Sequence, residues 1–191
     1  MTRGYFGIGV EDISKGMNAG NLARSAHAFG ASFFFAIAPV VDIRAMRASD
    51  TSGAFDHMPY HQYASAAELE LPKGCALVGV ELVEDSVELP SFRHPLRAAY
   101  VLGPEMGSLS PALQERCDFM VKIPMKFCVN VGVAGALVMY DRLLSTGRFA
   151  ARPISPGGPL EELAETVRGH RRFSRRLRAE QNRLKNAASS G

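Results

Sequence analysis

The sequence has little that would place it in a membrane or carry it out of the cell. Its longest apolar runs, Phe33–Val41 and Val133–Tyr140, are interrupted by Pro39 and Gly135 and are too short to span a bilayer. The first residues carry no apolar stretch of the kind that a secretory signal requires. We therefore expect a cytoplasmic protein with no membrane partner.

Cysteine is also scarce, with only Cys75, Cys117 and Cys128. An odd number of widely spaced cysteines with no Cys-x-x-Cys pair is typical of reduced thiols rather than of disulfides or a zinc site. Cys128 could be a nucleophile, but nothing in the sequence places a histidine beside it. A small buried thiol is the favoured interpretation of that residue.

Several catalytic signatures are absent. The sequence has no H-E-x-x-H, no G-x-S-x-G, no phosphate-binding P-loop and no G-x-G-x-x-G. His57 and His61 are four residues apart, but Pro59 between them disfavours a continuous helix, and no third ligand is apparent. We expect no metal site.

What is present indicates an α/β domain over residues 1–150. With 47% hydrophobic and 21% charged residues, the chain has enough apolar material for a packed core. Short apolar runs of strand length occur at Tyr5–Val10, Phe33–Ala38, Ala76–Leu82, Ala98–Leu102 and Phe119–Ile123.

Helical patterns alternate with these runs. Helices are expected at Asn18–Phe29, at Val131–Ser145 and from Ser110-Pro111 to Arg116, whereas residues 42–72 are less regular. This alternation predicts a mostly parallel sheet with helices on both faces. Such sheets bind ligands at the carboxyl ends of their strands.

The end of the chain differs in composition from the rest. Residues 151–159 contain three prolines and two glycines and are expected to form a linker. Residues 160–191 hold eight basic and four acidic residues, so this tail carries +4 while the remainder carries −1 of the total charge of +3.

The arginines of the tail have helical spacing. A helix would align five of them on one face: Arg168, Arg171, Arg172, Arg175 and Arg176. Charge alone leaves two interpretations open, a solvated basic helix or a face that contacts the phosphates of a nucleic acid.

Three separated segments combine polar and small residues. In the first, Asn18, Gly20 and Asn21 precede Arg24, which suits a phosphate at a helix start, although this segment alone favours an N-cap at Asn18 or Asn21 with a surface arginine. In the second, Gly103–Ser110, glycines follow a strand and Glu105 could bind local backbone amides or a ligand hydroxyl.

The third segment runs from Ile123 to Ala134. Asn130 opens an apolar helix that is rich in glycine and alanine. Small residues there would let a flat ligand or another backbone lie close. The alternative is a tightly packed core helix with Asn130 as its N-cap.

Together and in order, the three segments resemble the motifs of the SpoU/TrmH family of SPOUT RNA methyltransferases. The first matches N-x-G-N-x-x-R-x-A-x-x-F-G from Asn18 to Gly30. The second resembles G-x-E-x-x-G-L-S, although a single residue, Met106, separates Glu105 from Gly107 where many members have two. The third resembles I-P-M followed by S-L-N-V-S-V-A, with Cys128 and Gly132 in place of the two serines.

The resemblance covers roughly residues 4–147, and it implies both a fold and an activity. The sheet would be threaded into a C-terminal trefoil knot, whose loops hold S-adenosylmethionine. The protein would act as a homodimer in which both protomers contribute to each site. The usual product is a 2′-O-methylated ribose, and we place tRNA slightly ahead of rRNA as the substrate.

The resemblance also assigns roles to residues. Arg24 would hold the target phosphate and stabilise the developing alkoxide, because a guanidinium with a pKa above ~12 is a very weak base. Asn130, with Asn21 and Cys128, completes the expected catalytic set. The expected cofactor-binding residues are Val80, Glu81, Leu102, Gly103, Glu105, Gly107, Ile123, Met125, Val131 and Ala134. The expected RNA-binding residues are Asn18, Arg24, Arg168, Arg171, Arg172 and Arg175.

Two alternatives remain at this point. The loss of the family serines at Cys128 and Gly132 would fit a catalytically silent, knotted RNA-binding or assembly protein, because a thiol is a weaker hydrogen-bonding group than a hydroxyl. Methylation of a base rather than of a ribose is the other.

Overall fold

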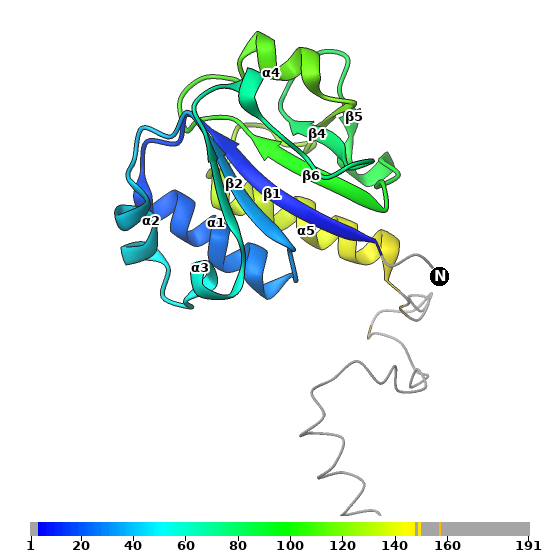
Figure 1. Ribbon diagram of the computed structural model, residues 1–191. Coiled ribbons are helices and arrows are strands. Elements are labelled where there is room, and N and C mark those ends of the chain that lie inside the picture. The colour runs from blue at the N-terminus through cyan, green and yellow to red at the C-terminus, as the bar shows by residue number, and fades with distance from the viewer. Residues whose placement is uncertain (1–3, 148, 150–156, 158–191) are drawn as a thin grey trace, which may run out of the picture. The chain divides into compact units, whose positions relative to one another are not determined.

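The computed structural model describes residues 4–147, together with residues 149 and 157. Its centre is a seven-stranded sheet with the strand order β3-β2-β1-β6-β4-β7-β5, in which every pairing between neighbours is parallel. The strands are β1 (Tyr5–Glu11), β2 (Phe33–Ile37), β3 (Tyr60–Tyr63), β4 (Ala76–Val80), β5 (Val87–Glu88), β6 (Arg97–Leu102) and β7 (Phe119–Lys122). The parallel sheet expected from the alternating pattern is confirmed (Figure 1).

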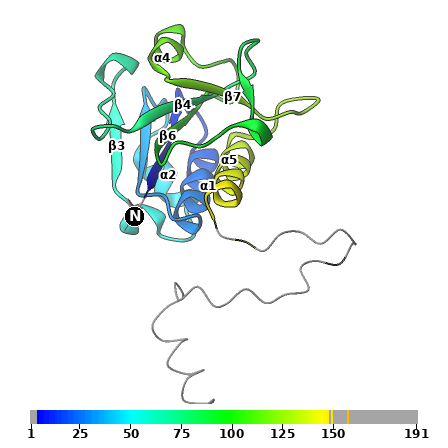
Figure 2. The same cartoon turned by 90° about the vertical axis from the view of Figure 1, so that its right-hand side faces the viewer.

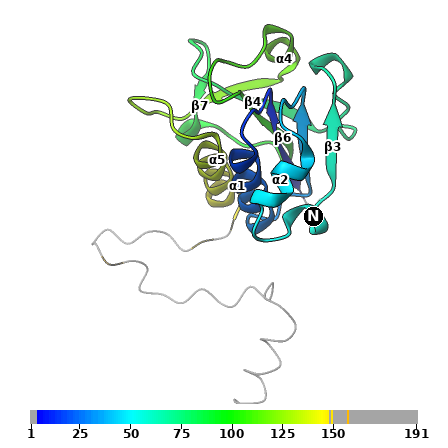
Figure 3. The same cartoon turned by 90° about the vertical axis from the view of Figure 1, so that its left-hand side faces the viewer.

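Helices pack on both faces of the sheet, as predicted (Figure 2). One face is covered by α1 (Gly16–Ala28) and α5 (Val131–Thr146), which pack side by side, with α2 (Ile43–Ser49) and α3 (Ala54–His57) beyond them (Figures 1 and 3). The other face is covered by α4 (Pro111–Arg116) and the short 3-10 turn η1 (Ala66–Glu68). A second such turn, η2 (Leu89–Ser91), follows β5.

The core is divided between these faces. Ile8, Phe34 and Tyr100 are buried beneath α1 and α5, whereas Phe35 and Val101 are buried on the α4 side. Because both faces are covered, the central strands are apolar along most of their length, which is why they stand out as continuous runs in the sequence.

The start of α1 differs from the prediction. The helix begins at Gly16 rather than Asn18, and Lys15 occupies the N-cap position without a side-chain cap. Asn18 and Asn21 therefore lie within the helix, and the interpretation of either as its N-cap is wrong. The caps expected elsewhere are confirmed: the Ser110 side chain accepts from the Leu113 N–H at α4, and the Asn130 side chain accepts from the Gly132 N–H at α5.

Close packing of α1 against α2 depends on Gly20. A Cβ atom built there would come within 2.9 Å of the Met46 carbonyl oxygen and within 2.8 Å of the Ser49 backbone. Since both neighbours are backbone, any side chain would force the helices apart. Gly20 of the first motif thus has a structural role in placing α1.

The linker at 151–159 and the tail at 160–191 lie outside the described residues, apart from Gly157, and so do Arg168, Arg171, Arg172 and Arg175. Within the part of the chain that the structure describes, no helix is long and apolar enough to cross a membrane.

Candidate functional site

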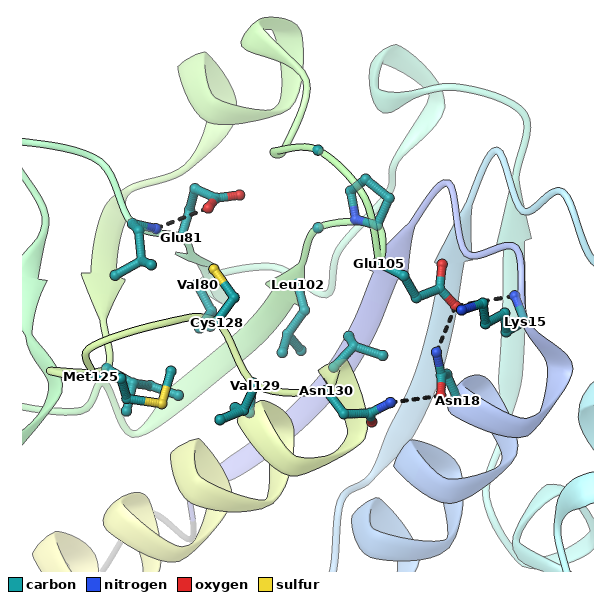
Figure 4. A pocket seen from close by; sticks show the side chains of 17 residues that line it. Lys15, Asn18, Val80, Glu81, Leu102, Glu105, Met125, Cys128, Val129 and Asn130 are labelled. Carbon is teal, nitrogen blue, oxygen red and sulfur yellow. Dashed lines mark hydrogen bonds between the residues drawn. The ribbon is translucent and has the colours of Figure 1, made fainter.

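A cavity of about 440 Å³ lies at the carboxyl ends of β4, β6 and β7, against the start of α5 (Figure 4). Carboxyl ends of parallel strands are the usual place for a ligand in an open α/β sheet. Seventeen residues line the cavity: Lys15, Asn18, Val80, Glu81, Leu82, Leu102, Gly103, Pro104, Glu105, Gly107, Ile123, Met125, Cys128, Val129, Asn130, Val131 and Ala134.

The cavity unites the three segments singled out in the sequence. All ten residues expected to bind the cofactor line it, and so do Asn18, Asn130 and Cys128. Four lining residues were missed, namely Lys15, Leu82, Pro104 and Val129. Each is a chain neighbour or near neighbour of a residue that was identified, so extending each motif by a few residues would have found them.

A chain of hydrogen bonds crosses one wall of the cavity and joins the three segments. The Asn18 side-chain amide donates to Glu105 Oε1 at 2.8 Å, and the Asn130 side-chain amide donates to Asn18 Oδ1 at 2.8 Å (Figure 4). Asn130 Oδ1 then accepts from the Gly132 N–H at 2.8 Å. Asn130 is thereby fixed at both ends, and it holds the start of α5 against α1.

Glu105 is bound to the start of α1 by both of its carboxylate oxygens. Oε2 accepts from the N–H and the hydroxyl of Ser14, and Oε1 accepts from the N–H of Lys15 as well as from Asn18. A carboxylate at a helix N-terminus is favourably placed with respect to the helix dipole. Burial raises the pKa of Glu105, but the hydrogen bonds from Asn18 and Ser14 outweigh it, so the pKa lies below its ordinary value of 4.5.

Two other carboxylates, Glu81 and Glu11, accept hydrogen bonds from the loop that follows β6. Glu81 Oε2 accepts from the Leu109 N–H at 3.0 Å, and Glu81 Oε1 accepts from the Leu82 N–H at 2.9 Å. The buried Glu11, at the end of β1, accepts from both the N–H and the hydroxyl of Ser110. These bonds hold the loop from Gly103 to Ser110 in one conformation beside the cavity.

The balance of charge in the cavity is set by three side chains. Both of the lining carboxylates, Glu81 and Glu105, are committed to protein donors. Lys15 is the one cationic side chain among the described residues that line the cavity, and it lies beside Glu105 (Figure 4). No cluster of three or more metal-ligating side chains occurs in the described ranges 4–147, 149 and 157.

Comparison with known proteins identifies the family. The model of the SpoU rRNA Methylase family matches residues 6–140, which is well over half of the chain. The chain belongs to this family. The resemblance drawn from the three motifs is thereby confirmed.

The curated relatives that this chain matches are longer proteins. A putative TrmH family tRNA/rRNA methyltransferase, YacO of Bacillus subtilis, is 28% identical over 142 residues, which are 69% of this chain and 55% of that protein. The chain spans little more than half the length of such curated relatives.

Solved structures of family members have the same fold. The SpoU methyltransferase AviRb from Streptomyces viridochromogenes, solved in complex with AdoMet, superposes with a TM-score of 0.67 at 22% identity and covers 78% of this chain and 61% of that one. A structure described in terms of the 2-OH methylation of C/U34 on tRNA superposes with a TM-score of 0.61 at 25% identity and covers 76% of this chain and 99% of that one.

Arg24 of the first SpoU motif does not line the cavity. It is exposed on α1, and its guanidinium donates to Thr51 Oγ1 at 2.7 Å. Asn21, one turn earlier, is also exposed and lies beside the first turn of α5, where its Cβ is 3.5 Å from the position that a Cβ on Gly132 would take. Of the four residues expected to be catalytic, the structure thus brings Asn130 and Cys128 into the cavity and leaves Arg24 and Asn21 outside it.

Cys128, which replaces a SpoU-family serine, is exposed, so its interpretation as a buried thiol is wrong. It lies on the loop between β7 and α5, where its side chain lines the cavity (Figure 4). An exposed loop has no apolar surroundings to bury a thiol. The second replacement, Gly132, is buried in the first turn of α5, where a Cβ would come within 3.2 Å of Asn130 Oδ1.

Proposed function

We propose that this chain is an S-adenosylmethionine-dependent RNA methyltransferase that methylates a ribose 2′-hydroxyl, in tRNA first and in rRNA second. The observation that carries the proposal is the single cavity in which all three family motifs meet. Membership of the SpoU rRNA methylase family supports the RNA substrate, and the AdoMet bound to AviRb supports the cofactor. The relative described for C/U34 of tRNA supports both the ribose hydroxyl and the choice of tRNA.

The cavity fits this cofactor in size and in chemistry. Its volume of about 440 Å³ lies within the usual range for small-molecule sites, and its walls combine apolar side chains with several polar groups. At Gly103 a Cβ would come within 3.1 Å of the Leu109 nitrogen and 3.2 Å of Glu81 Oε2, so a side chain there would disturb the loop that borders the cavity. Backbone at Leu102–Gly107, Ile123–Met125 and Val131–Ala134 would hold the adenine, ribose and methionine parts, with Val80 and Glu81 completing the site.

The bound cofactor supplies a methyl group that its sulfonium already activates. The residues of the chain therefore have to align the ribose oxygen with that methyl group and its sulfur, and to stabilise the negative charge that develops on the oxygen as the hydroxyl proton leaves to the solvent. Arg24 is suited to the second task through its fixed positive charge and its ability to bind a phosphate with two parallel hydrogen bonds. Asn130 positions the loop between β7 and α5, since both ends of its amide are already engaged.

The location of Arg24 outside the cavity of its own chain favours a homodimer in which it acts at the cavity of the partner. The exposed side of α5 supports this arrangement. It carries an apolar stripe with helical spacing, made of Val133, Leu137, Tyr140 and Leu144, whose side chains are 37–50% exposed. We include in the same proposal the C-terminal trefoil knot, which the convergence of the loops after β6 and β7 on one cavity favours, and a cytoplasmic location.

The test is methyl transfer from S-adenosylmethionine with a labelled methyl group to unmodified tRNA and rRNA transcripts. A 2′-O-methyl group protects the adjoining phosphodiester from alkali, because the hydroxyl that would attack it is blocked. Labelled alkali-resistant dinucleotides are expected, whereas label on alkali-released mononucleotides would indicate a methylated base and contradict the proposal.

Isothermal titration separates the enzyme from the silent RNA-binding alternative that the replaced serines suggest. The enzyme is expected to release heat on binding S-adenosylmethionine. No heat together with intact RNA binding would instead identify a protein that has kept the fold and lost the cofactor.

A further inference from the structure

The two most exposed large apolar side chains of the described residues both lie beside the cavity. Met106 is 89% exposed on the loop that follows β6, and Phe127 is 77% exposed on the loop that joins β7 to α5. Each stands between cavity-lining residues: Glu105 and Gly107 on one loop, and Met125 and Cys128 on the other. The two most solvent-exposed large apolar side chains thus both lie at the rim of the site.

Phe127 is the more informative of the two. Cys128, the next residue, and Met125, two residues earlier, line the cavity, whereas the Phe127 side chain does not line it and remains in solvent. The loop that carries it stands away from the body of the protein (Figures 2 and 3). A large apolar ring kept in water on a projecting loop is a common feature of interaction sites.

The surroundings of this ring favour a nucleic acid as its partner. Lys126 is the preceding residue and is also exposed, and a second lysine, Lys15, lines the cavity. An aromatic ring next to a cation is the combination that proteins use for unpaired RNA, where the ring stacks on a base and the cation attracts the backbone.

We propose that Phe127 stacks on an unpaired nucleobase of the RNA at the mouth of the cavity and so positions the nucleotide that is methylated. This inference rests on the proposed function and adds to it a residue that selects for an unstacked, single-stranded target. A stacking platform on the rim would offset part of the cost of taking that nucleotide out of a helical stack.

Two other partners for the Phe127 ring are less favoured, namely the cofactor and a second copy of the chain. The adenine of the cofactor would have to lie outside the cavity to reach a side chain that does not line it. A second copy of the chain could bury more apolar surface on the α5 stripe than at Phe127. The exposed Lys126 next to Phe127 also makes this loop less suited to an apolar interface.

Kinetics with tRNA test the proposal. Phe127→Ala is expected to raise the KM for RNA by at least about 5-fold, since stacking on an aromatic ring is worth that much or more per base. The dissociation constant for S-adenosylhomocysteine should not change, and Phe127→Tyr should restore the KM. Leu96→Ala is the matched control, because Leu96 is 60% exposed and precedes β6 at the opposite end of the sheet. An unchanged KM in Phe127→Ala, in a chain that methylates tRNA normally, would overturn the stacking alone and leave the proposed function standing.

Fluorescence gives an independent readout, because the chain has no tryptophan. In Phe127→Trp the single tryptophan is expected to be quenched by tRNA in the presence of S-adenosylhomocysteine. Quenching by S-adenosylhomocysteine alone would assign the ring to the cofactor, and a spectrum that changes with protein concentration in the absence of RNA would assign it to a second copy. Either result overturns the proposal. A wild-type chain that binds tRNA but transfers no methyl group would instead count against the proposed function, while the quenching would still decide whether the ring stacks.

Discussion

Glu105 and Arg24 are both motif residues, but only Glu105 lines the cavity. Glu105 is bonded to Ser14, Lys15 and Asn18 beside the cavity, whereas Arg24 reaches outward to Thr51. Glu105 therefore holds two segments of the protein together rather than offering a free carboxylate to a ligand. Arg24 keeps an exposed charge that can meet RNA.

For Arg24, we predict that substitution by alanine abolishes methyl transfer and leaves the affinity for S-adenosylmethionine unchanged. The reason is that the residue does not line the cavity but carries the charge that would stabilise the reacting oxygen. Single-turnover assays and calorimetric titration measure the two quantities. Thr51→Ala, which removes only the hydrogen-bond partner, should retain most of the activity, and an active Arg24→Ala enzyme would contradict the role.

For Glu105, we predict a stability difference that depends on pH. Glu105→Gln replaces one carboxylate oxygen by an NH₂ group, which cannot accept the hydrogen bonds that this oxygen accepts in the wild type. The variant is therefore expected to unfold at a lower temperature near neutral pH. The folded-state pKa of Glu105 is below 4.5, so its stabilisation is complete above that pH and is lost as the pH falls through the lowered folded value. The two melting curves should thus converge in acid. A gap that stays constant with pH would rule out the charge as its cause.

At the level of whole elements, five of the seven strands were predictable, whereas β3, β5 and the start of α1 were not. Strands buried on both faces leave continuous apolar runs, which any reading of the sequence detects. The beginning of α1 lacks a side-chain cap of its own, because the acceptor for the Ser14 and Lys15 amides is Glu105, about ninety positions further along the chain. A local signal could not reveal that partner. The exposure of Cys128 was missed for a related reason, since the surroundings of a loop residue depend on the fold.

The cap of α5 offers a test at this level. Asn130→Ala removes both the cap on Gly132 and the bond to Asn18, so the free energy of unfolding should fall by about 1 kcal/mol or more. Asn130→Asp keeps an acceptor for Gly132 but cannot donate to Asn18 and should lose less. Denaturant unfolding measures both variants.

Asp42→Ala is the control for this prediction, because it removes the cap of α2, whose residues do not line the cavity. It should cost stability while sparing cofactor affinity, whereas Asn130→Ala should weaken both. Equal cofactor affinity in all three variants would show that Asn130 acts only as a cap.

For the molecule as a whole, the sequence predicted which segments would converge but not how they are held. All ten of the residues expected to bind the cofactor line the cavity, and most of them come from the motifs. The hydrogen bonds that link Glu105, Asn18 and Asn130 could not be predicted from the sequence and are seen only in the structure. The basic residues at 160–191 lie outside the described residues, and their contribution to RNA binding stays a prediction.

Deleting residues 160–191 should weaken RNA binding and flatten its dependence on salt, because eight basic residues that can neutralise phosphates are removed. Affinity for S-adenosylmethionine should not change, since the cavity is built from residues 15–134. Filter binding over a salt series, with the full chain alongside, measures the effect. Equal slopes for the two chains would exclude a role for the tail.

The bonds that close the cavity wall join residues 87 and 112 positions apart. Contacts of such high contact order form late in folding, after the loops between them have paid their closure entropy. During synthesis the site therefore cannot form until α5 has emerged from the ribosome. A nascent chain that lacks α5 has an incomplete cavity and is not expected to bind S-adenosylmethionine. Ligand added to refolding protein should accordingly raise the final melting temperature without hastening the early phases.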